Sequence, residues 1–298
     1  MSNHTTVTLS QERQREAVIA RRKKKWNDFL HTVGNHSVLI SFSVVFLLPL
    51  YLVVVISLMD HGQAETRSIW PHPFIWHNYV EVFTAVPFLK WTLNTLFVSA
   101  LSTLGTVLSS VPPAYVLSRL QWKGRGITFV IILSTMMLPG QVTMIPVYII
   151  FSKLHWIPSF LPLIVPSFFS SAFSIFLLRQ FFVSIPDEIS DAARIDGCSE
   201  FKLMMRIVVP LAKPAIMAIA LFSFLGSWND FFGPLLYIVE NQNLWTLGIG
   251  LNAFQGVHHV QSNMMMTASV LFMAPVIILF FFSQKVFIEG VTLTGVKG

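Results

Sequence analysis

Six apolar segments, each long enough to cross a lipid bilayer, constrain what this chain can fold into. A transmembrane helix needs about 20 predominantly apolar residues. In lipid, an irregular segment would leave its backbone polar groups unpaired, so segments of this length favour helices. They cover residues 37–59, 92–117, 127–151, 158–182, 208–238 and 264–287. The sequence therefore predicts an all-α, polytopic membrane protein with six transmembrane helices.

The low content of charge supports a single membrane domain. Only 11% of the residues are charged and 54% are hydrophobic, whereas soluble domains average about 25% charged residues. Cys198 is the only cysteine, which excludes an internal disulfide and a cysteine-based metal cluster. His258 and His259 make a poor metal site, because neighbouring residues on a helix point apart. We therefore expect no metal and no cofactor in this chain.

The distribution of lysine and arginine predicts how the chain is oriented in the membrane. With the N-terminus placed in the cytoplasm, 17 of the 20 basic residues fall in cytoplasmic segments. Cytoplasmic loops of membrane proteins carry such an excess of positive charge. Both termini and the polar stretch at residues 184–210 are thus expected on the cytoplasmic side of a multi-pass protein of the cell membrane.

The polar N-terminal segment, residues 1–36, contains a basic run at residues 21–25. Such a run can bind nucleic acid or anionic lipid, and beside a membrane span we favour membrane lipid and expect no nucleic-acid partner. The predicted organisation is this segment, a transmembrane domain at 37–290 and a cytoplasmic tail at 291–298. Arg119, at the inner end of the second span, is expected to anchor that span at the membrane edge.

The polar stretch at residues 184–210 is patterned as two short helices with a break between them. Ser184 and Asp187 have the spacing of a capping box at the start of the first helix. Gly197 is expected to end that helix, because glycine adopts the left-handed cap conformation freely. Ser199 then starts the second helix.

Small and apolar side chains are expected to share one face of the first helix. Ile189, Ala192 and Ala193 follow the i, i+3, i+4 spacing, and Phe201 projects from the second helix. These residues fit a surface that docks into another protein. An amphipathic connector lying on the membrane is an equally good interpretation from physics alone.

The same stretch resembles the EAA loop of ABC importer permeases. The matching residues are Asp-Ala-Ala-Arg-Ile-Asp-Gly at 191–197, Phe201, and Ile-Val-Val-Pro at 207–210. The chain departs from the family pattern with Asp191 in place of Glu and Cys198 in place of Ala. Further similarity to maltose-permease-like subunits of carbohydrate importers extends from about residue 37, through Tyr115, Ser118, Arg119, Trp228-Asn229-Asp230-Phe231 and Gly295-Val296-Lys297-Gly298.

The resemblance implies the permease subunit of a prokaryotic ABC importer for a sugar or oligosaccharide, forming the translocation path and having no catalysis of its own. It further implies cytosolic ATPase chains that carry ATP and Mg, a second and different permease subunit, and an extracytoplasmic solute-binding protein. The sequence itself contains no nucleotide-binding Gly-x-x-x-x-Gly-Lys-Ser/Thr loop. The expected ATPase-coupling residues are Glu188, Asp191, Ala192, Ala193, Arg194, Asp196, Gly197 and Phe201.

Trp228, Asn229 and Asp230 lie inside the fifth predicted span. An ionisable residue at membrane depth usually faces a cavity or a partner, and an aromatic ring beside amide and carboxylate groups suits a sugar. The alternative is a structural role, since polar groups also join membrane helices. The family resemblance implies that the other permease subunit holds most of the sugar.

Two other functions remain open from the residues alone. An ion-coupled secondary transporter would keep ionisable residues at mid-membrane, and Asp230 is almost the only acid inside a predicted span. A membrane assembly protein without transport of its own would need no coupling to an ATPase.

Overall fold

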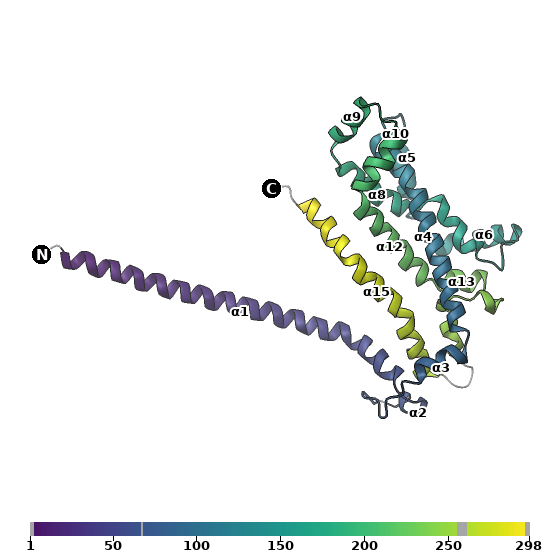
Figure 1. The fold of residues 1–298 in the computed structure, drawn as a ribbon, viewed down its shortest axis with the longest axis horizontal. Coiled ribbons are helices and arrows are strands. Elements are labelled where there is room, and N and C mark those ends of the chain that lie inside the picture. Colours follow the sequence, from purple (N-terminus) through teal and green to yellow (C-terminus); the bar gives the residue numbers. More distant parts are fainter. Residues whose placement is uncertain (1–2, 67, 255–260, 296–298) are drawn as a thin grey trace.

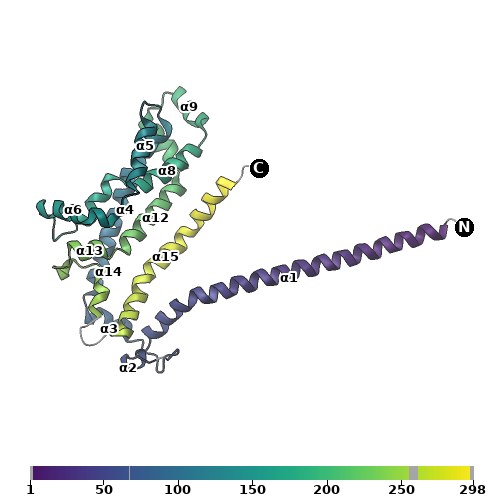
Figure 2. The same ribbon diagram turned by 180° about the vertical axis from the view of Figure 1, so that it is seen from behind.

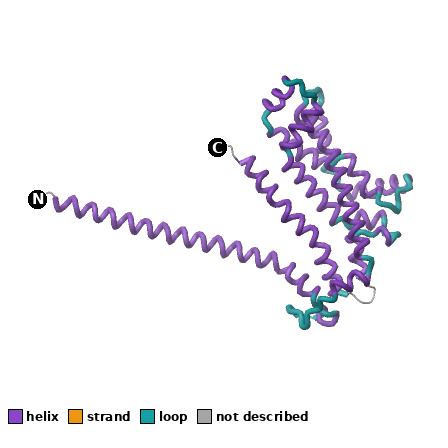
Figure 3. The backbone as a smooth tube through the Cα atoms, viewed as in Figure 1, coloured by secondary structure: helices purple, strands orange, loops and turns teal. Residues whose placement is uncertain are grey.

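The computed structural model describes residues 3–66, 68–254 and 261–295, with side chains described between Leu30 and Gln284. All regular structure in these ranges is helical, and Figure 3 shows no strand in them. The all-α prediction is confirmed for this part of the chain.

The helices vary in length from single turns to long rods (Figure 1). In chain order they are α1 (Asn3–Ser57), α2 (His61–Ala64), α3 (Asn78–Ala85), α4 (Phe88–Arg119), α5 (Arg125–Thr135), α6 (Gly140–Lys153), α7 (Leu161–Ile164), the 3-10 turn η1 (Val165–Phe169), α8 (Ala172–Ser184), α9 (Asp187–Ile195), α10 (Glu200–Leu203), the π-helical turn η2 (Met204–Val208), α11 (Val209–Leu211), α12 (Lys213–Trp228), α13 (Phe232–Tyr237), η3 (Gln242–Leu244), α14 (Leu247–Gly250), η4 (Leu251–Phe254) and α15 (Ser262–Gly295).

Four segments in the described residues are long and apolar enough to cross a membrane as one helix. They are Leu30–Ser57, Phe88–Arg119, Leu161–Ser184 and Ser262–Gln284. Two helix pairs become further spans only if each is counted across a sharp bend, of 91° between α5 and α6 and of 79° between Glu200–Leu211 and α12. The third and fifth predicted spans are therefore not the straight helices that the apolar pattern indicated.

Proline accounts for the breaks. Pro139 directly precedes α6 with an extended backbone, and proline removes a backbone donor that a continuous helix needs. Pro210 lies in the short helix before the second bend, and Pro214 stands in the first turn of α12. Apolar pattern alone shows that a segment suits lipid, whereas these prolines decide where its axis turns.

Helix α4 runs through the centre of the bundle and packs against α8 and α12 (Figures 1 and 2). Its buried surface is rich in small residues, including Ser99, Ser102 and Gly105. A Cβ atom at Gly105 would lie 2.6 Å from the Phe168 ring. Small residues thus let the chain at η1 approach α4 closely, as is common where membrane helices pack.

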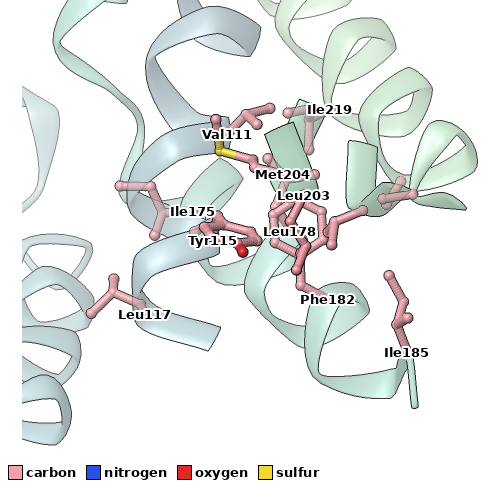
Figure 4. Packing of buried hydrophobic residues seen from close by; sticks show 14 of the residues in the cluster. Val111, Tyr115, Leu117, Ile175, Leu178, Phe182, Ile185, Leu203, Met204 and Ile219 are labelled. Carbon is pink, nitrogen blue, oxygen red and sulfur yellow. The ribbon is translucent and has the colours of Figure 1, made fainter. Parts of the chain in front are cut away.

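Two clusters of buried residues lie at different levels of the bundle. Figure 4 shows the first, where α4, α8, α10, η2 and α12 meet around Leu178, Phe182 and Leu203, all fully buried. The second surrounds Trp91 and Trp228 and joins α4, α12, α14 and α15. Helices α9 and α10 pack against the first cluster.

Helices α1 and α15 diverge from their meeting point beside α2 and α3 (Figure 1). Only 6% of the most apolar 18-residue stretch of α1 is buried inside the chain, compared with 44% of the corresponding stretch of α4. Helix α1 continues without a break past residue 36, and α15 extends to Gly295, beyond the predicted start of the tail.

Candidate functional site

The two short helices predicted between residues 184 and 210, here called the coupling segment, are present at one end of the bundle (Figure 1). Helix α9 ends at Ile195, and Gly197 adopts a left-handed backbone with φ +79°. Helix α10 begins after Ser199. A Cβ atom at Gly197 would meet nothing within 4 Å. The break and the second start are therefore confirmed, and the turn is open on its outer side.

The predicted capping box is wrong. Ser184 belongs to α8, and its Oγ donates to the Phe181 carbonyl at 2.7 Å. Pro186 is the N-cap of α9 and makes no side-chain cap hydrogen bond. The residue before a proline is pushed to an extended conformation, so Ile185 ends α8 and separates Ser184 from the next helix. Asp187 is left to bond elsewhere.

Two of the three residues predicted to share the docking face of α9 are exposed, and the third is buried. Ser190 and Ala193 are buried, whereas Ile189 and Ala192 are exposed. Consecutive helical residues are about 100° apart, so a shift by one position turns Ile189 outward. Ala193, which was predicted to contact an ATPase, packs in the core instead.

The exposed residues of the coupling segment include large apolar side chains among charged ones. Ile195 is 87% exposed and Phe201 is 69% exposed. Glu188 and Asp196 are exposed beside them. We call Ile189, Ala192, Ile195, Gly197 and Phe201 the coupling surface.

Arg194 ties the two short helices together across the Gly197 turn. Its guanidinium donates to Asp191 Oδ1 at 2.8 Å and to Glu200 Oε1 at 2.7 Å. The hydrogen bond to Glu200 is the largest cause that raises the pKa of Arg194. Asp191 and Arg194, both predicted to contact an ATPase, thus also hold the segment in shape.

Arg119 does not anchor α4 at a membrane edge. Its side chain is only 1% exposed, and it lies between α4 and the start of α9. One guanidinium nitrogen donates to the Ile185 carbonyl at 2.6 Å, and the other forms an ion pair with Asp187. The sequence alone could not show this. The groups that bind the arginine are a carbonyl and a carboxylate at the α8–α9 junction, and not water or lipid headgroups.

Tyr115 makes a second link from α4. Its hydroxyl donates to Glu200 Oε2 at 2.5 Å, and the tyrosine is buried (Figure 4). Sequence reasoning singled out Tyr115 and Arg119 but did not connect them to the coupling segment, and it gave Glu200 no role. The available signal was their i, i+4 spacing, which places both on one face of a helix.

Trp228 does not lie inside a continuous helix, because α12 ends at this residue. The indole is almost fully buried, stacks between Phe224 and Phe272, and donates through Nε1 to the Phe272 carbonyl at 3.2 Å. These contacts favour the structural alternative for Trp228, which fastens α12 to α15.

Asn229 and Asp230 form the turn after α12. Asn229 is exposed, and its amide donates back to the Leu225 carbonyl at 2.8 Å. Asp230 accepts from the Gly233 backbone N–H at 3.1 Å. A Cβ atom at Gly233 would collide with the Asp230 carboxylate, so a larger residue would displace that carboxylate. Of the three predicted path residues, Asn229 alone is exposed.

Two cavities lie elsewhere. One of about 370 Å³ is lined by Asp60, Glu81 and Asn263 among others, and one of about 200 Å³ lies between α4, α12 and α15. Among the residues searched, which are those the structure describes, no group of three His, Cys, Asp or Glu side chains is placed to hold a metal ion. Cys198 is a partly buried free thiol. His258 and His259 lie outside the described residues.

Comparison with protein families gives a match over residues 110–292, which include α9, α10 and most of the bundle. The matching family is described as the inner membrane component of binding-protein-dependent transport systems. The match covers more than half of the chain.

Individual relatives agree with this match. The chain is 35% identical, over 86% of its length and 92% of the relative's, to the arabinooligosaccharides transport system permease protein AraQ of Bacillus subtilis (strain 168). It is 29% identical, over 90% of its length and 98% of the relative's, to the inner membrane ABC transporter permease protein YcjP of Escherichia coli (strain K12).

The fold is also shared with a solved structure. A chain of a bacterial ABC transporter that imports the acidic polysaccharide alginate superimposes with a TM-score of 0.75 at 24% identity, covering 87% of this chain and 97% of that one. The helical arrangement, the coupling segment and the family match agree. This chain belongs to the family of inner membrane components of binding-protein-dependent transport systems, the non-catalytic permease subunits of ABC importers.

Proposed function

We propose that this chain imports a sugar or oligosaccharide, as one of two permease subunits that enclose the translocation path. The observation that carries its coupling role is the apolar coupling surface, held on a buried base at one end of the bundle. The carbohydrate assignment is supported by the relative from Bacillus subtilis, which is named for arabinooligosaccharides. Another relative, at 31% identity, is named for sn-glycerol-3-phosphate, so the substrate class rests on the first.

In this proposal the chain crosses the membrane six times, with each bent helix pair counted as one span. Both termini lie in the cytoplasm. The arrangement in Figure 1 supports this topology, because the end of α4, the coupling segment and the far end of α15 lie at the same end of the bundle. The positive-inside distribution assigns that end to the cytoplasm.

The coupling surface then docks into a cytosolic ATPase, which holds ATP and Mg. Interfaces typically combine an apolar centre with a polar rim. Ile195 and Phe201 supply the apolar centre, and Glu188 and Asp196 supply carboxylates at the rim. Ala192 and Gly197 leave room for close approach. Closure of two ATPases on ATP would move this segment and turn the path between inward- and outward-facing states.

A second, different permease subunit would cover α1 and α15. The most apolar windows of these helices are only 6% and 11% buried within this chain, and the two helices diverge from a common base (Figure 2). An extracytoplasmic solute-binding protein would deliver the sugar. A similar fold occurs in the alginate transporter in complex with its pentasaccharide-bound periplasmic protein, at a TM-score of 0.64 and 17% identity.

Within this chain, the turn at Trp228, Asn229 and Asp230 would border the translocation path. Asn229 offers an exposed amide to a sugar hydroxyl. Trp228 and Asp230 would hold the turn in place through their packing and backbone contacts. The partner permease supplies most of the sugar contacts in this proposal.

The deciding experiment places a large side chain on the coupling surface. Gly197→Trp is expected to leave the protein in the membrane and to abolish ATP-dependent sugar uptake, because the indole occupies the open side of the turn. Uptake and ATP hydrolysis are measured together in vesicles that contain the whole transporter. Normal uptake by Gly197→Trp would contradict the docking role.

Two variants separate docking from backbone strain and from bulk. Gly197→Asn keeps a residue that tolerates the left-handed conformation and is expected to retain most uptake. Gly126→Trp adds the same indole at another glycine with open space around it, on α5. It is expected to leave uptake unchanged.

A further inference from the structure

We propose that α4 holds the coupling segment at the start of each of its two short helices, and that this clasp transmits the movement of the segment to the bundle. The clasp consists of Tyr115 and Arg119 on α4, with Glu200 and Asp187 on the coupling segment. The inference rests on the proposed coupling function and adds the route by which force passes from the docked surface to the transmembrane helices.

The geometry of the clasp follows from the last turns of α4. Tyr115 and Arg119 are i, i+4 neighbours and therefore project from one face of the helix. Arg119 holds the entry to α9 through Asp187 and the Ile185 carbonyl. Tyr115 holds the start of α10 through Glu200. One helix face thus fixes the starts of both short helices that carry the coupling surface.

The two sides of the clasp differ in exposure. On α4 both residues are buried, and the Arg119 side chain is only 1% exposed. On the coupling segment, the side chains of Asp187 and Glu200 are 86% and 43% exposed. Buried polar groups are costly unless they are bonded, so α4 needs these carboxylates. The carboxylates remain hydrated and can shift without losing their own solvation.

Arg119 also has an unused hydrogen-bond donor. Its Nε atom is buried and has no hydrogen-bond partner among the residues that the structure describes. Because a guanidinium presents several donors in a fixed plane, the Asp187 carboxylate can slide from one nitrogen to another while staying bound. The clasp therefore tolerates a small rotation of α9 without opening.

The covalent connections at the two ends of the coupling segment transmit movement less directly than the clasp does. The entry from α8 passes through the extended residue Ile185 and then Pro186. The exit passes through the π-helical turn η2 and the 79° bend before α12. Residues at the ends of helices can act as hinges that absorb backbone rotation. The clasp instead reaches α4, which packs against both α8 and α12.

The test measures sugar transported per ATP hydrolysed in proteoliposomes containing the complete transporter. Asp187→Asn and Glu200→Gln weaken the clasp by removing its negative charges from the exposed side, where folding is least at risk. Each is expected to lower the ratio by about fivefold or more, a typical coupling factor between distant sites. Binding of the ATPase, measured by co-purification, should stay at the level of the unsubstituted protein.

Variants on the α4 side sharpen the result. Tyr115→Phe removes one hydroxyl and should lower the ratio of sugar transported to ATP hydrolysed. Arg119→Lys keeps the charge, so its ratio should be higher than that of Arg119→Met. Lys123→Met and Glu240→Gln, which change exposed charges outside the clasp, should leave the ratio unchanged.

The outcomes separate this inference from the docking role. An unchanged ratio in Asp187→Asn and Glu200→Gln would overturn the clasp, even if Gly197→Trp abolished uptake. Loss of ATPase co-purification in these two variants would also overturn it, because they would then act on docking. If Arg119→Met fails to assemble, the two carboxylate variants still decide the question.

Discussion

The two ends of α4 hold distant parts of the chain with the same spacing but with different chemistry. At its N-terminal end, the neighbours Trp91 and Thr95 fasten the segment around η3 and α14. At its C-terminal end, Tyr115 and Arg119 fasten the coupling segment. Both pairs are i, i+4 neighbours on one helix face.

The bonds of Trp91 and Thr95 are neutral and involve backbone groups, although the nearby Lys90 also donates to Asn243 Oδ1 at 2.7 Å. Trp91 donates to the Gln242 carbonyl at 3.3 Å, and Thr95 accepts from the Leu247 N–H at 2.8 Å. At the C-terminal end, charged side chains meet side chains that are partly exposed. The comparison indicates that one end is built to stay fixed, whereas the other is built to move while remaining attached.

The largest expected effect comes from removing the aromatic anchor at the fixed end. Trp91 is fully buried, lies 5.6 Å from the Trp245 ring and packs directly on Gly250. Trp91→Ala is expected to lower the free energy of unfolding by about 3–5 kcal/mol. Thermal unfolding of the purified transporter measures this loss.

The matched control is Trp76→Ala, since Trp76 is 67% exposed. Surface substitutions usually change stability by about 0.5 kcal/mol or less. Equal losses in the two variants would mean that burial at the N-terminal end of α4 does not hold the fold.

A smaller effect is expected from the neutral hydrogen bond beside this anchor. Thr95→Val keeps the volume but leaves the buried Leu247 N–H without its acceptor. Such an unpaired group costs about 1–3 kcal/mol. The measurement is the same unfolding transition, and Thr84→Val on the exposed side of α3 provides the comparison. A loss no larger than that of the control would show that another group replaces the acceptor.

Local sequence signals predicted what local chemistry decides. Gly197 ends α9 because its left-handed backbone suits glycine, and Ser199 precedes α10 as expected. Four of the six apolar segments are single helices, as their length and composition predicted. The family resemblance then gave that segment a coupling role, and the family match over residues 110–292 confirmed the family.

Tertiary contacts decided what the sequence did not predict. Ala192 and Ala193 differ by one position, and only the packing of α9 on the first buried cluster selects which is covered. Arg119 at the end of an apolar span fits a membrane anchor equally well until Ile185 and Asp187 are placed beside it. The sharp bends likewise depend on how prolines are accommodated by neighbouring helices.

The smallest effect on stability is expected at the movable end. Arg194 pairs with Asp191 and Glu200, and all three side chains are at least 36% exposed. Exposed ion pairs contribute about 0.2–1 kcal/mol each. Arg194→Gln should therefore lower the free energy of unfolding by about 1 kcal/mol or less, in contrast to Trp91→Ala.

High salt should separate the stability losses of the variants at the two ends of α4. At an ionic strength near 1 M the screening length falls to about 3 Å, so Arg194→Gln and the unsubstituted transporter should unfold at nearly the same temperature. The Trp91→Ala difference should persist, because its cause is lost packing. A salt-independent loss well above 1 kcal/mol in Arg194→Gln would show that this ion-pair network is part of the fixed framework. The charged end of α4 would then be as rigid as the neutral one, and the distinction between a fixed and a movable end would fail.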